Sequence, residues 1–210
     1  MHVLVPFDAR QPKSRLADVL DDGERQTFAR AMLADVLDAI EETGHEPTVL
    51  STAQVDCRAS VTVDERPLTT AVNDALDERA LPVGVVMSDL ALATADTLDA
   101  LFGTAGDVVI APGLGGGTNA LVVRHAEFEV DYHGTSVRDH REAATAVGAN
   151  LQVVDSYRLG VDIDDPTDLV EVLLHNDRTA TTWLDDAGFR LETREGRATI
   201  ARTGTESDGT

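Results

Sequence analysis

Lysine and cysteine are almost absent from this 210-residue sequence, which contains one of each, Lys13 and Cys57. A single cysteine excludes a disulfide within the chain and a cysteine-rich metal cluster, and we expect Cys57 to be a buried structural thiol in a reducing cytosol. Long apolar runs are also missing. The longest covers about residues 83–87, whereas a membrane helix needs roughly 20. Because no basic and hydrophobic leader follows Met1, we expect a cytoplasmic protein without a membrane segment.

Basic residues are scarce as a class. The chain has 17 lysines and arginines against 38 aspartates and glutamates, a formal net charge of -21. These acids are spread along the chain and would repel polyanions, so no nucleic-acid partner is expected. The preference for arginine over lysine resembles proteins from cytoplasms filled with molar salt, where screening within about 3 Å removes the self-repulsion of such a surface. A halophilic archaeal source is therefore our hypothesis.

Apolar runs typical of strands alternate with amphipathic stretches, a pattern that indicates βαβ units. We expect strands at residues 2–7, 48–51, 60–63, 83–87, 108–111, 120–124 and 151–154. We expect a long helix that ends at Gly44, with further helices at residues 69–79, 94–102, 136–147 and 168–175. The sequence predicts an α/β three-layer sandwich with a mixed, mainly parallel sheet.

The pattern changes after His175. A short helix is expected at residues 179–184, and residues 189–193 and 198–202 flank a Glu195-Gly196 turn in the manner of a hairpin. We therefore divide the chain into a main domain, an appendage and a tail that we expect to be disordered because it has no apolar anchor. These three parts are residues 1–175, 176–202 and 203–210.

Aspartates follow expected strands at two places. Asp89 comes directly after the most apolar run, where a carboxylate is costly unless a cation or hydrogen bonds satisfy it. Asp162 and Asp164 alternate in an extended segment and so share one face. Open α/β sheets bind ligands beyond the carboxyl ends of their strands, and Mg²⁺ prefers oxygen ligands, so these acids predict a magnesium site. The alternative is capping, by Asp89 of the turn after its strand and by Asp164 or Asp165 of a following helix.

Two loops of small residues favour anion binding. Gly115, Gly116 and Gly117 precede Thr118 between two expected strands, and such glycines let backbone amides approach a ligand, although a wide hairpin turn is the alternative. Residues 133–140 enter a helix whose first amides make an anion site. Ser136 can cap this helix whether or not the loop binds an anion. For His133 and His140, a structural hydrogen bond is favoured over proton transfer.

Three cations, Arg10, Lys13 and Arg15, lie within six residues after the first expected strand. In so acidic a chain this concentration is an exception, and lysine with arginine is well suited to phosphate. The segment therefore predicts the place of a triphosphate. A solvated basic turn is the alternative.

Together these segments resemble the 2-phospho-L-lactate guanylyltransferase family, called CofC in archaea, which makes a precursor of coenzyme F(420). The resemblance runs from about Val3 to Leu174 and departs from the family pattern at Asp8, Ala91 and Asp165. It rests on Lys13-Ser14-Arg15-Leu16, Asp35-Val36-Leu37, Asn73 with Ala75-Leu76, Ser88-Asp89-Leu90, Gly116-Gly117-Thr118-Asn119-Ala120-Leu121, Ser136 with His140, and Asp162-Ile163-Asp164 before Pro166.

The resemblance implies a nucleotide-diphospho-sugar transferase fold, GT-A-like and Rossmann-like, and a set of site residues. The residues that match the Mg²⁺ ligands are Asp89, Asp162 and Asp164. The nucleotide-binding positions are Lys13, Arg15, Asn73 and Asp89, of which Lys13, Arg15 and Asp89 are also catalytic. The positions that bind the phosphorylated acid are Gly117, Thr118, Gly134 and Ser136.

The implied reaction joins GTP and 2-phospho-L-lactate to give lactyl-2-diphospho-5'-guanosine and pyrophosphate. A downstream lactyl-phosphate transferase would take the product, and the oligomeric state stays open, a homodimer included. Phosphoenolpyruvate, which an actinobacterial relative of the family accepts, and 3-phosphoglycerate are alternative acceptors. A sugar-phosphate or molybdopterin nucleotidyltransferase shares the fold but usually carries a glycine-rich, Arg-containing loop after the first strand, which is absent here. A non-enzymatic nucleotide-binding regulator is the alternative from another class.

Overall fold

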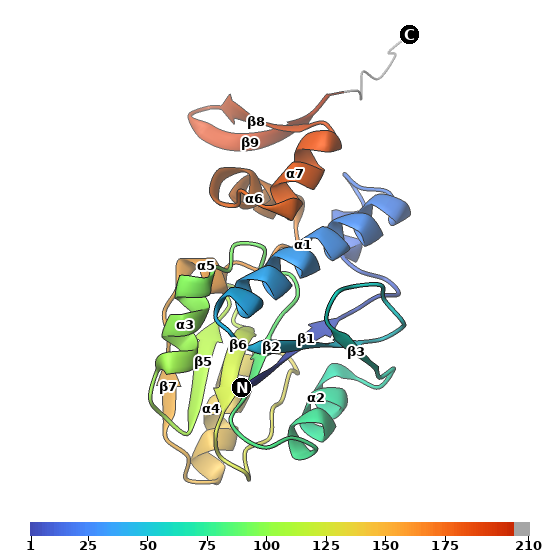
Figure 1. Cartoon of the computed structure of the whole chain (residues 1–210). Helices are drawn as coiled ribbons and strands as arrows, with labels where there is room; N and C mark the ends of the chain where they lie inside the picture. The colour runs from blue at the N-terminus through green and yellow to red at the C-terminus, as the bar shows by residue number, and fades with distance from the viewer. Residues whose placement is uncertain (204–210) are drawn as a thin grey trace.

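A seven-stranded mixed sheet forms the centre of the molecule, whose computed structural model describes residues 1–203. The strand order is β3-β2-β1-β4-β6-β5-β7, and only β6 runs antiparallel to its two neighbours (Figure 1). The strands are β1 (His2–Phe7), β2 (Glu46–Ser51), β3 (Ser60–Val63), β4 (Val83–Val86), β5 (Val108–Pro112), β6 (Thr118–Val123) and β7 (Leu151–Val153). The expected mixed, mainly parallel sheet is confirmed.

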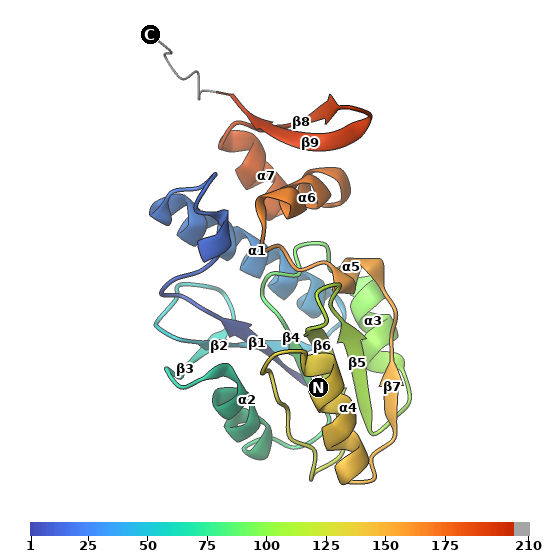
Figure 2. The same cartoon turned by 180° about the vertical axis from the view of Figure 1, so that it is seen from behind.

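Helices cover both faces of this sheet, which confirms the three layers (Figures 1 and 2). One face packs against α1 (Asp22–Glu42) and α3 (Ala95–Gly103), and the other against α2 (Leu68–Asp77) and α4 (Ser136–Ala146). Side chains alternate accordingly. In β1, Val3 and Val5 join the core on the α1 side, whereas Leu4 joins the core on the α2 side.

Helix α1 has local signals at both ends. At its start, Asp21 Oδ1 accepts a hydrogen bond from Glu24 N at 2.8 Å, and Glu24 Oε2 accepts one from Asp21 N at 3.0 Å, which completes a capping box. The apolar face of the helix, from Phe28 to Ile40, is buried. Gly44 has a φ of 73°, so its left-handed backbone ends the helix where the sequence predicted.

The C-terminal elements lie beyond α1, away from the sheet, with α7 packed on α1 and the others packed on α7 or on one another (Figure 1). They are α6 (Leu169–His175), α7 (Thr179–Asp186), β8 (Phe189–Arg194) and β9 (Arg197–Arg202). The buried carboxylate of Asp35 accepts hydrogen bonds from the backbone N–H groups of Thr179 at 2.8 Å and Ala180 at 2.9 Å. A negative group there satisfies the free amides at the start of α7. Leu184 and Phe189 belong to the core on the α1 side.

Element boundaries agree with the expected ranges to within one or two residues, but three short elements were not predicted from the sequence. They are the 3-10 turns Ser14–Leu16 and Pro166–Asp168 and the helix α5 (Tyr157–Gly160). Pieces of three or four residues are too short to show a periodic pattern. The thiol of Cys57 is half-buried rather than buried, because it lies in a surface loop beside exposed Asp56.

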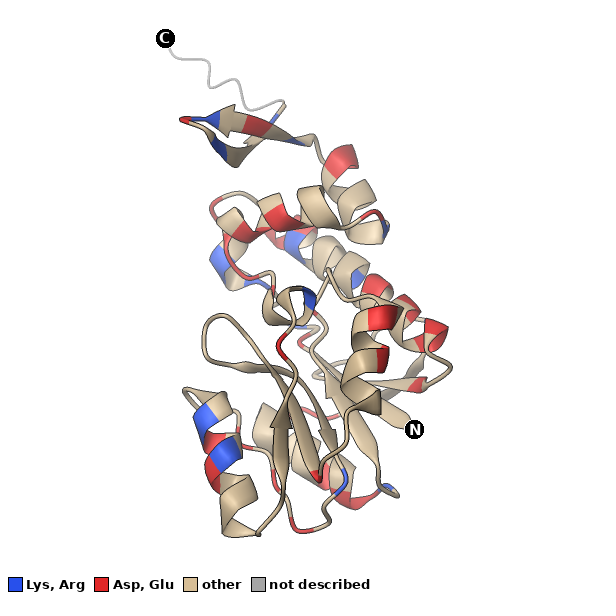
Figure 3. Ribbon diagram, turned by 90° about the vertical axis from the view of Figure 1, so that its left-hand side faces the viewer, with Lys and Arg blue, Asp and Glu red and all other residues tan. Residues whose placement is uncertain are grey.

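Acidic residues are distributed over several helices and loops of the molecule, as Figure 3 shows. In the part of the chain that the structure describes, no helix is both long and apolar enough to cross a membrane. Of the tail expected to be disordered, Thr203 donates its N–H to Gly188 O at 2.9 Å. The rest of that tail, residues 204–210, lies outside the described residues.

Candidate active site

A cavity of about 450 Å³ lies beyond the carboxyl ends of β1, β2, β3 and β4. Its walls include Asp8 after β1, Thr52 after β2, Asp64 after β3 and Asp89 after β4. The loop after β1 is held by Asp8, whose Oδ1 accepts hydrogen bonds from Arg10 N and from Thr52 Oγ1, each at 3.0 Å. The parallel strands therefore bring four chain-distant segments to one opening, where open α/β sheets bind their ligands.

Lys13 lies at one end of this cavity between two carboxylates. Its Nζ is 2.6 Å from Asp89 Oδ2 and 2.8 Å from Asp164 Oδ1, and its side chain is only 10% exposed. Its backbone φ of 55° is rare outside glycine and places it at the start of the 3-10 turn. Burial works against the charge, but the attraction of Asp89 and Asp164 outweighs it, so the pKa of Lys13 is raised. The lysine stays protonated.

The expected metal residues divide into two groups. Both oxygens of Asp164 are engaged, one by Lys13 and one by Arg15, whose guanidinium also lies 3.3 Å from Asp165. Burial favours the neutral form of Asp164, but the attraction of Lys13 and Arg15 outweighs it and lowers its pKa. Asp162 differs, because burial and the nearby charge of Asp89 raise its pKa and its hydrogen-bond partner is a neutral amide.

One oxygen in this cluster lacks a partner. Asp89 Oδ1 is buried and receives no hydrogen bond within residues 1–203. No group of three or more acids, histidines or cysteines in that range has an arrangement that alone would hold a metal. Mg²⁺ is commonly bound by one or two carboxylates together with substrate phosphates, so a free oxygen on Asp89 beside Asp162 fits such an ion. Asp165 occupies the N-cap position of the turn that begins at Pro166, where Asp168 Oδ2 accepts hydrogen bonds from Asp164 N at 3.0 Å and Asp165 N at 2.7 Å.

The glycine loop is a hairpin between β5 and β6, in which Gly113 N donates to Gly117 O at 2.7 Å. A side chain on Gly113 would meet Asn119 Oδ1 at 2.5 Å. Asn119 in turn donates to Asp162 Oδ1 at 3.2 Å and to Leu159 O at 3.0 Å. The loop therefore closes over Asn119, which positions Asp162, and this role of Asn119 was not predicted from the sequence.

Thr118 and Ser136 meet, although they lie on different elements. Thr118 N donates to Ser136 Oγ at 2.8 Å, and Thr118 Oγ1 lies 2.8 Å from His140 Nδ1. Both hydroxyl residues are buried, 3% and 4% exposed. Burial lowers the pKa of His140 to about 4, so its ring is neutral near pH 7 and serves as a structural partner. Gly134 precedes this group with a φ of 59°, in the loop that leads into α4.

Asn73 lies elsewhere. Its side chain donates to Val130 O at 3.0 Å and accepts from Val130 N at 2.8 Å, so the amide holds the loop before α4. It does not line the cavity. The wall residues Thr52, Asp64 and Arg66 were not predicted as site residues, although two of them directly follow strands, which is the feature that identified Asp89.

Solved structures share this fold. A structure from Desulfovibrio desulfuricans, provisionally described as a nucleotide-diphospho-sugar transferase, superposes with a TM-score of 0.73 at 13% identity and covers 88% of this chain and 94% of its own. A nucleotidyl transferase from Methanothermobacter has a TM-score of 0.57 at 13% identity, covering 83% and 96%. At such identities the likeness concerns the fold. The fold is that of nucleotide-diphospho-sugar transferases, as predicted.

The sequence comparisons are more specific. The family described as guanylyl transferase CofC like matches residues 1–203. A 2-phospho-L-lactate guanylyltransferase from Natronomonas pharaonis is 60% identical over 204 residues, covering 97% of this chain and all of the relative. Its counterpart from Haloferax volcanii is 56% identical over 203 residues, covering 96% and 98%. The chain belongs to the CofC-like guanylyl transferase family, which confirms the resemblance found in the sequence.

Proposed function

We propose that this protein transfers the guanylyl group of GTP to the phosphate of 2-phospho-L-lactate, in the biosynthesis of coenzyme F(420). The observation that carries the proposal is the full-length match to relatives of that activity at 50–60% identity. The position of Lys13, between Asp89 and Asp164 at the end of an open cavity, supports it.

The reaction requires that the two substrates be positioned, more than it requires proton transfer. A phosphate oxygen of the acceptor attacks the α-phosphorus of GTP, a new P–O bond forms, and the bond to the β-phosphate oxygen breaks as pyrophosphate leaves with its electron pair. A phosphate monoester is already anionic near neutral pH, so no general base is assigned. Lys13 and Arg15 would face the phosphates and offset the charge that develops on the leaving group.

Magnesium is part of the proposal because of the charges around Lys13. Lys13 and Arg15 stand beside four carboxylates, those of Asp89, Asp162, Asp164 and Asp165, so this end carries excess negative charge. A triphosphate would be repelled unless further positive charge accompanied it. Asp89, through its free oxygen, and Asp162 would hold the ion. Bound Mg²⁺ would supply charge neutralisation and orientation of the phosphates.

Thr118, Ser136 and Gly134 remain our proposed contacts of the acceptor. Ser136 Oγ accepts from Thr118 N, which leaves its own proton free to donate to an anion. The product would pass to a lactyl-phosphate transferase, and we place the reaction in the cytoplasm.

The test is pyrophosphate release from GTP and Mg²⁺ with 2-phospho-L-lactate, phosphoenolpyruvate or 3-phosphoglycerate, in molar KCl. We expect 2-phospho-L-lactate to give the largest kcat/KM and the guanosine diphosphate-linked lactate as product, identified by mass spectrometry. A preference for another acceptor would correct the assigned substrate. If no acceptor of the three led to pyrophosphate release, the proposed activity would be overturned.

A further inference from the structure

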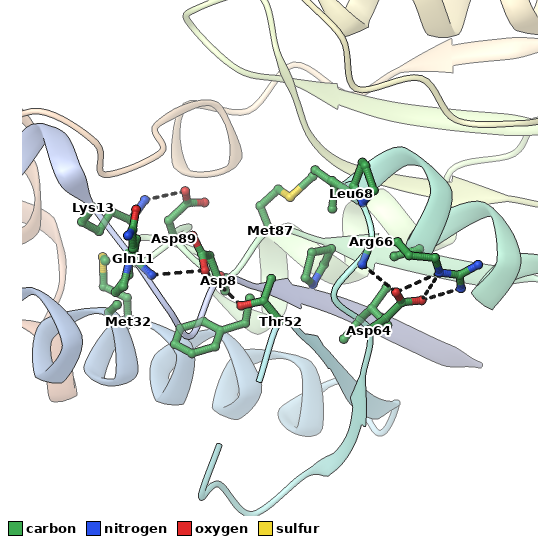
Figure 4. A pocket seen from close by; sticks show the side chains of 18 residues that line it. Asp8, Gln11, Lys13, Met32, Thr52, Asp64, Arg66, Leu68, Met87 and Asp89 are labelled. Carbon is green, nitrogen blue, oxygen red and sulfur yellow. Dashed lines mark hydrogen bonds and ion pairs between the residues drawn. The ribbon is translucent and has the colours of Figure 1, made fainter. Parts of the chain in front are cut away.

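The cavity has a second polar end that the proposed chemistry does not use. Figure 4 shows Lys13 and Asp89 on one side and Asp64 and Arg66 on the other, with Thr52 and Met87 between them. If GTP occupies this cavity, its triphosphate belongs with Lys13 and Arg15, where the reaction takes place. The base then extends toward Asp64 and Arg66.

Asp64 and Arg66 form a rigid pair. Asp64 Oδ1 accepts hydrogen bonds from Arg66 N at 2.9 Å and Nε at 3.0 Å, and Asp64 Oδ2 accepts one from Nη2 at 2.6 Å and shares the Nε–H at 3.2 Å. Arg66 Nη1 donates to Asp74 on the following helix. Asp64 is 13% exposed, whereas Arg66 is 51% exposed, so the arginine is held in place by two carboxylates while its outer edge stays accessible.

Hydrogen-bonding capacity remains on both side chains. Arginine has five N–H donors, and the bonds to Asp64 and Asp74 leave one free on each terminal nitrogen. The Asp64 carboxylate takes three hydrogens, from Arg66 N, Nε and Nη2, with the Nε–H shared between Oδ1 at 3.0 Å and Oδ2 at 3.2 Å. A carboxylate has about four acceptor sites, so one is left for a further donor. The pair therefore presents an acceptor beside a donor, both in fixed positions at the cavity wall.

This arrangement is complementary to guanine. On the base edge that pairs with cytosine, the N1–H donor lies directly beside the O6 acceptor. Adenine in the same orientation offers an acceptor at N1 and a donor at position 6, so each contact would have the wrong polarity. We propose that Asp64 accepts from guanine N1–H while Arg66 donates to O6, and that this pair determines the preference for GTP over ATP. The inference rests on the proposed guanylyl transfer and adds to it the residues that recognise the base.

The experiment is calorimetric titration of nucleotides without acceptor, using GTP, ATP, N1-methyl-GTP and 2'-deoxy-GTP. N1-methyl-GTP lacks the N1–H, and 2'-deoxy-GTP lacks the 2'-hydroxyl that a carboxylate could bind instead. The variants are Asp64→Ala and Arg66→Gln. Glu65→Gln is the matched control, because Glu65 lies between the two in sequence but pairs with Arg10 and does not line the cavity.

Removal of either hydrogen bond to the base should weaken GTP binding by about 10- to 100-fold, since a good polar interaction with a base edge discriminates by that factor. We expect both variants to weaken GTP binding and leave ATP binding nearly unchanged, and Asp64→Ala to bring the affinities for GTP and N1-methyl-GTP close together. Glu65→Gln should behave as wild type.

Unchanged GTP-to-ATP ratios in folded Asp64→Ala and Arg66→Gln would overturn the inference and leave guanylyl transfer standing. A loss of preference for GTP over 2'-deoxy-GTP, with the base preference intact, would assign the pair to the ribose and also overturn it. If the wild type binds none of these nucleotides, this inference falls together with the proposed function.

Discussion

The two halves of the candidate active site differ in how their polar groups are satisfied. In the nucleotide half, charged side chains border an open cavity and Asp89 Oδ1 has no partner among the described residues. In the proposed acceptor half, Thr118 and Ser136 are buried and hydrogen-bonded to each other, and Thr118 is also hydrogen-bonded to His140.

This difference predicts how the stability of each half changes when its ligand binds. A buried carboxylate oxygen without a partner is costly, so the nucleotide half gains stability when a cation arrives. In the proposed acceptor half the hydroxyl groups of Thr118 and Ser136 are already hydrogen-bonded, and the buried atom without a partner among the described residues is Nε2 of the neutral His140 ring, which costs less to bury than a charged carboxylate oxygen. We therefore expect the nucleotide half to respond strongly to changes in charge, and the acceptor half to changes in packing and hydrogen bonding.

The largest effect should come from removing salt, which would unfold the protein and so disrupt both halves of the site together. The net charge of -21 repels itself when the screening length grows from about 3 Å at 1 M salt to about 10 Å at 0.1 M. Circular-dichroism melts should show a large fall in Tm, or unfolding at room temperature, in dilute buffer. Sucrose in place of KCl serves as control and should not restore the fold. A melt unchanged between dilute buffer and molar KCl would refute this expectation.

Asp89→Asn should have the next largest effect, because the amide lacks the charge that holds Lys13 and a metal ion. We expect kcat for pyrophosphate release to fall by at least about 10²–10³-fold, with the circular-dichroism spectrum retained. Asp164→Asn should lower kcat at least as far, because it removes the charge that holds both Lys13 and Arg15. Asp155→Asn, at an exposed site after β7, is the control. Near wild-type activity of Asp89→Asn across a magnesium titration would remove Asp89 from the metal site.

Acid should act on the acceptor half through His140. Burial lowers its pKa to about 4, against the opposing pull of Asp131 and Asp139, whereas the unfolded chain titrates near 6.5. Between these pH values the unfolded state binds more protons than the folded state. The contribution of His140 to the free energy of unfolding is therefore complete above pH 6.5 and is lost as the pH falls toward 4. This contribution is about 3 kcal/mol.

Denaturant titrations at several pH values in molar KCl measure this contribution. His140→Gln should flatten the pH dependence of the free energy of unfolding in that interval, whatever its effect on the absolute value. His133→Gln, at an exposed histidine, should leave the wild-type slope. Equal slopes for His140→Gln and wild type would show that His140 does not carry the dependence.

The smallest effects should separate the two substrates. Lys13→Ala should weaken GTP binding, and Thr118→Val should weaken acceptor binding, each by about one to two orders of magnitude for the loss of a hydrogen bond to a charged group. Thr118→Ser keeps the hydroxyl and should stay near wild type. Calorimetry with GTP alone and KM for the acceptor measure the two affinities. If Thr118→Val weakened GTP binding as much as acceptor binding, the division of the site would be wrong.

Much of this architecture could be predicted because its signals are local. The apolar run of β1, the capping residues of α1 and Gly44 each lie within a few positions of the structure that they specify. Asp89 could be placed at the site because it closely follows a buried strand, three residues after Val86. Asp64 follows β3 in the same way, but β3 is short and mostly exposed, so its sequence does not mark the carboxylate after it as a site residue.

Partnerships between distant residues could not be predicted. Asn73 has the residue type of a nucleotide contact, yet its amide is taken by Val130, 57 positions away. The hydroxyl of Thr118 has the same ambiguity, because whether it faces a ligand or His140 depends on how α4 packs beside β6.

The sequence by itself determined the order of strands and helices, the family and the acidic surface, because periodicity, motifs and composition are properties of the chain alone. Only the tertiary structure decided which charges meet. Lys13 pairs with Asp89 and Asp164, which are 76 and 151 positions away, and it does so because β1 lies beside β4 in the sheet. A sequence specifies that a carboxylate follows a strand; the cation that neutralises it depends on the neighbours that folding brings within a few ångströms, where electrostatic attraction is strong.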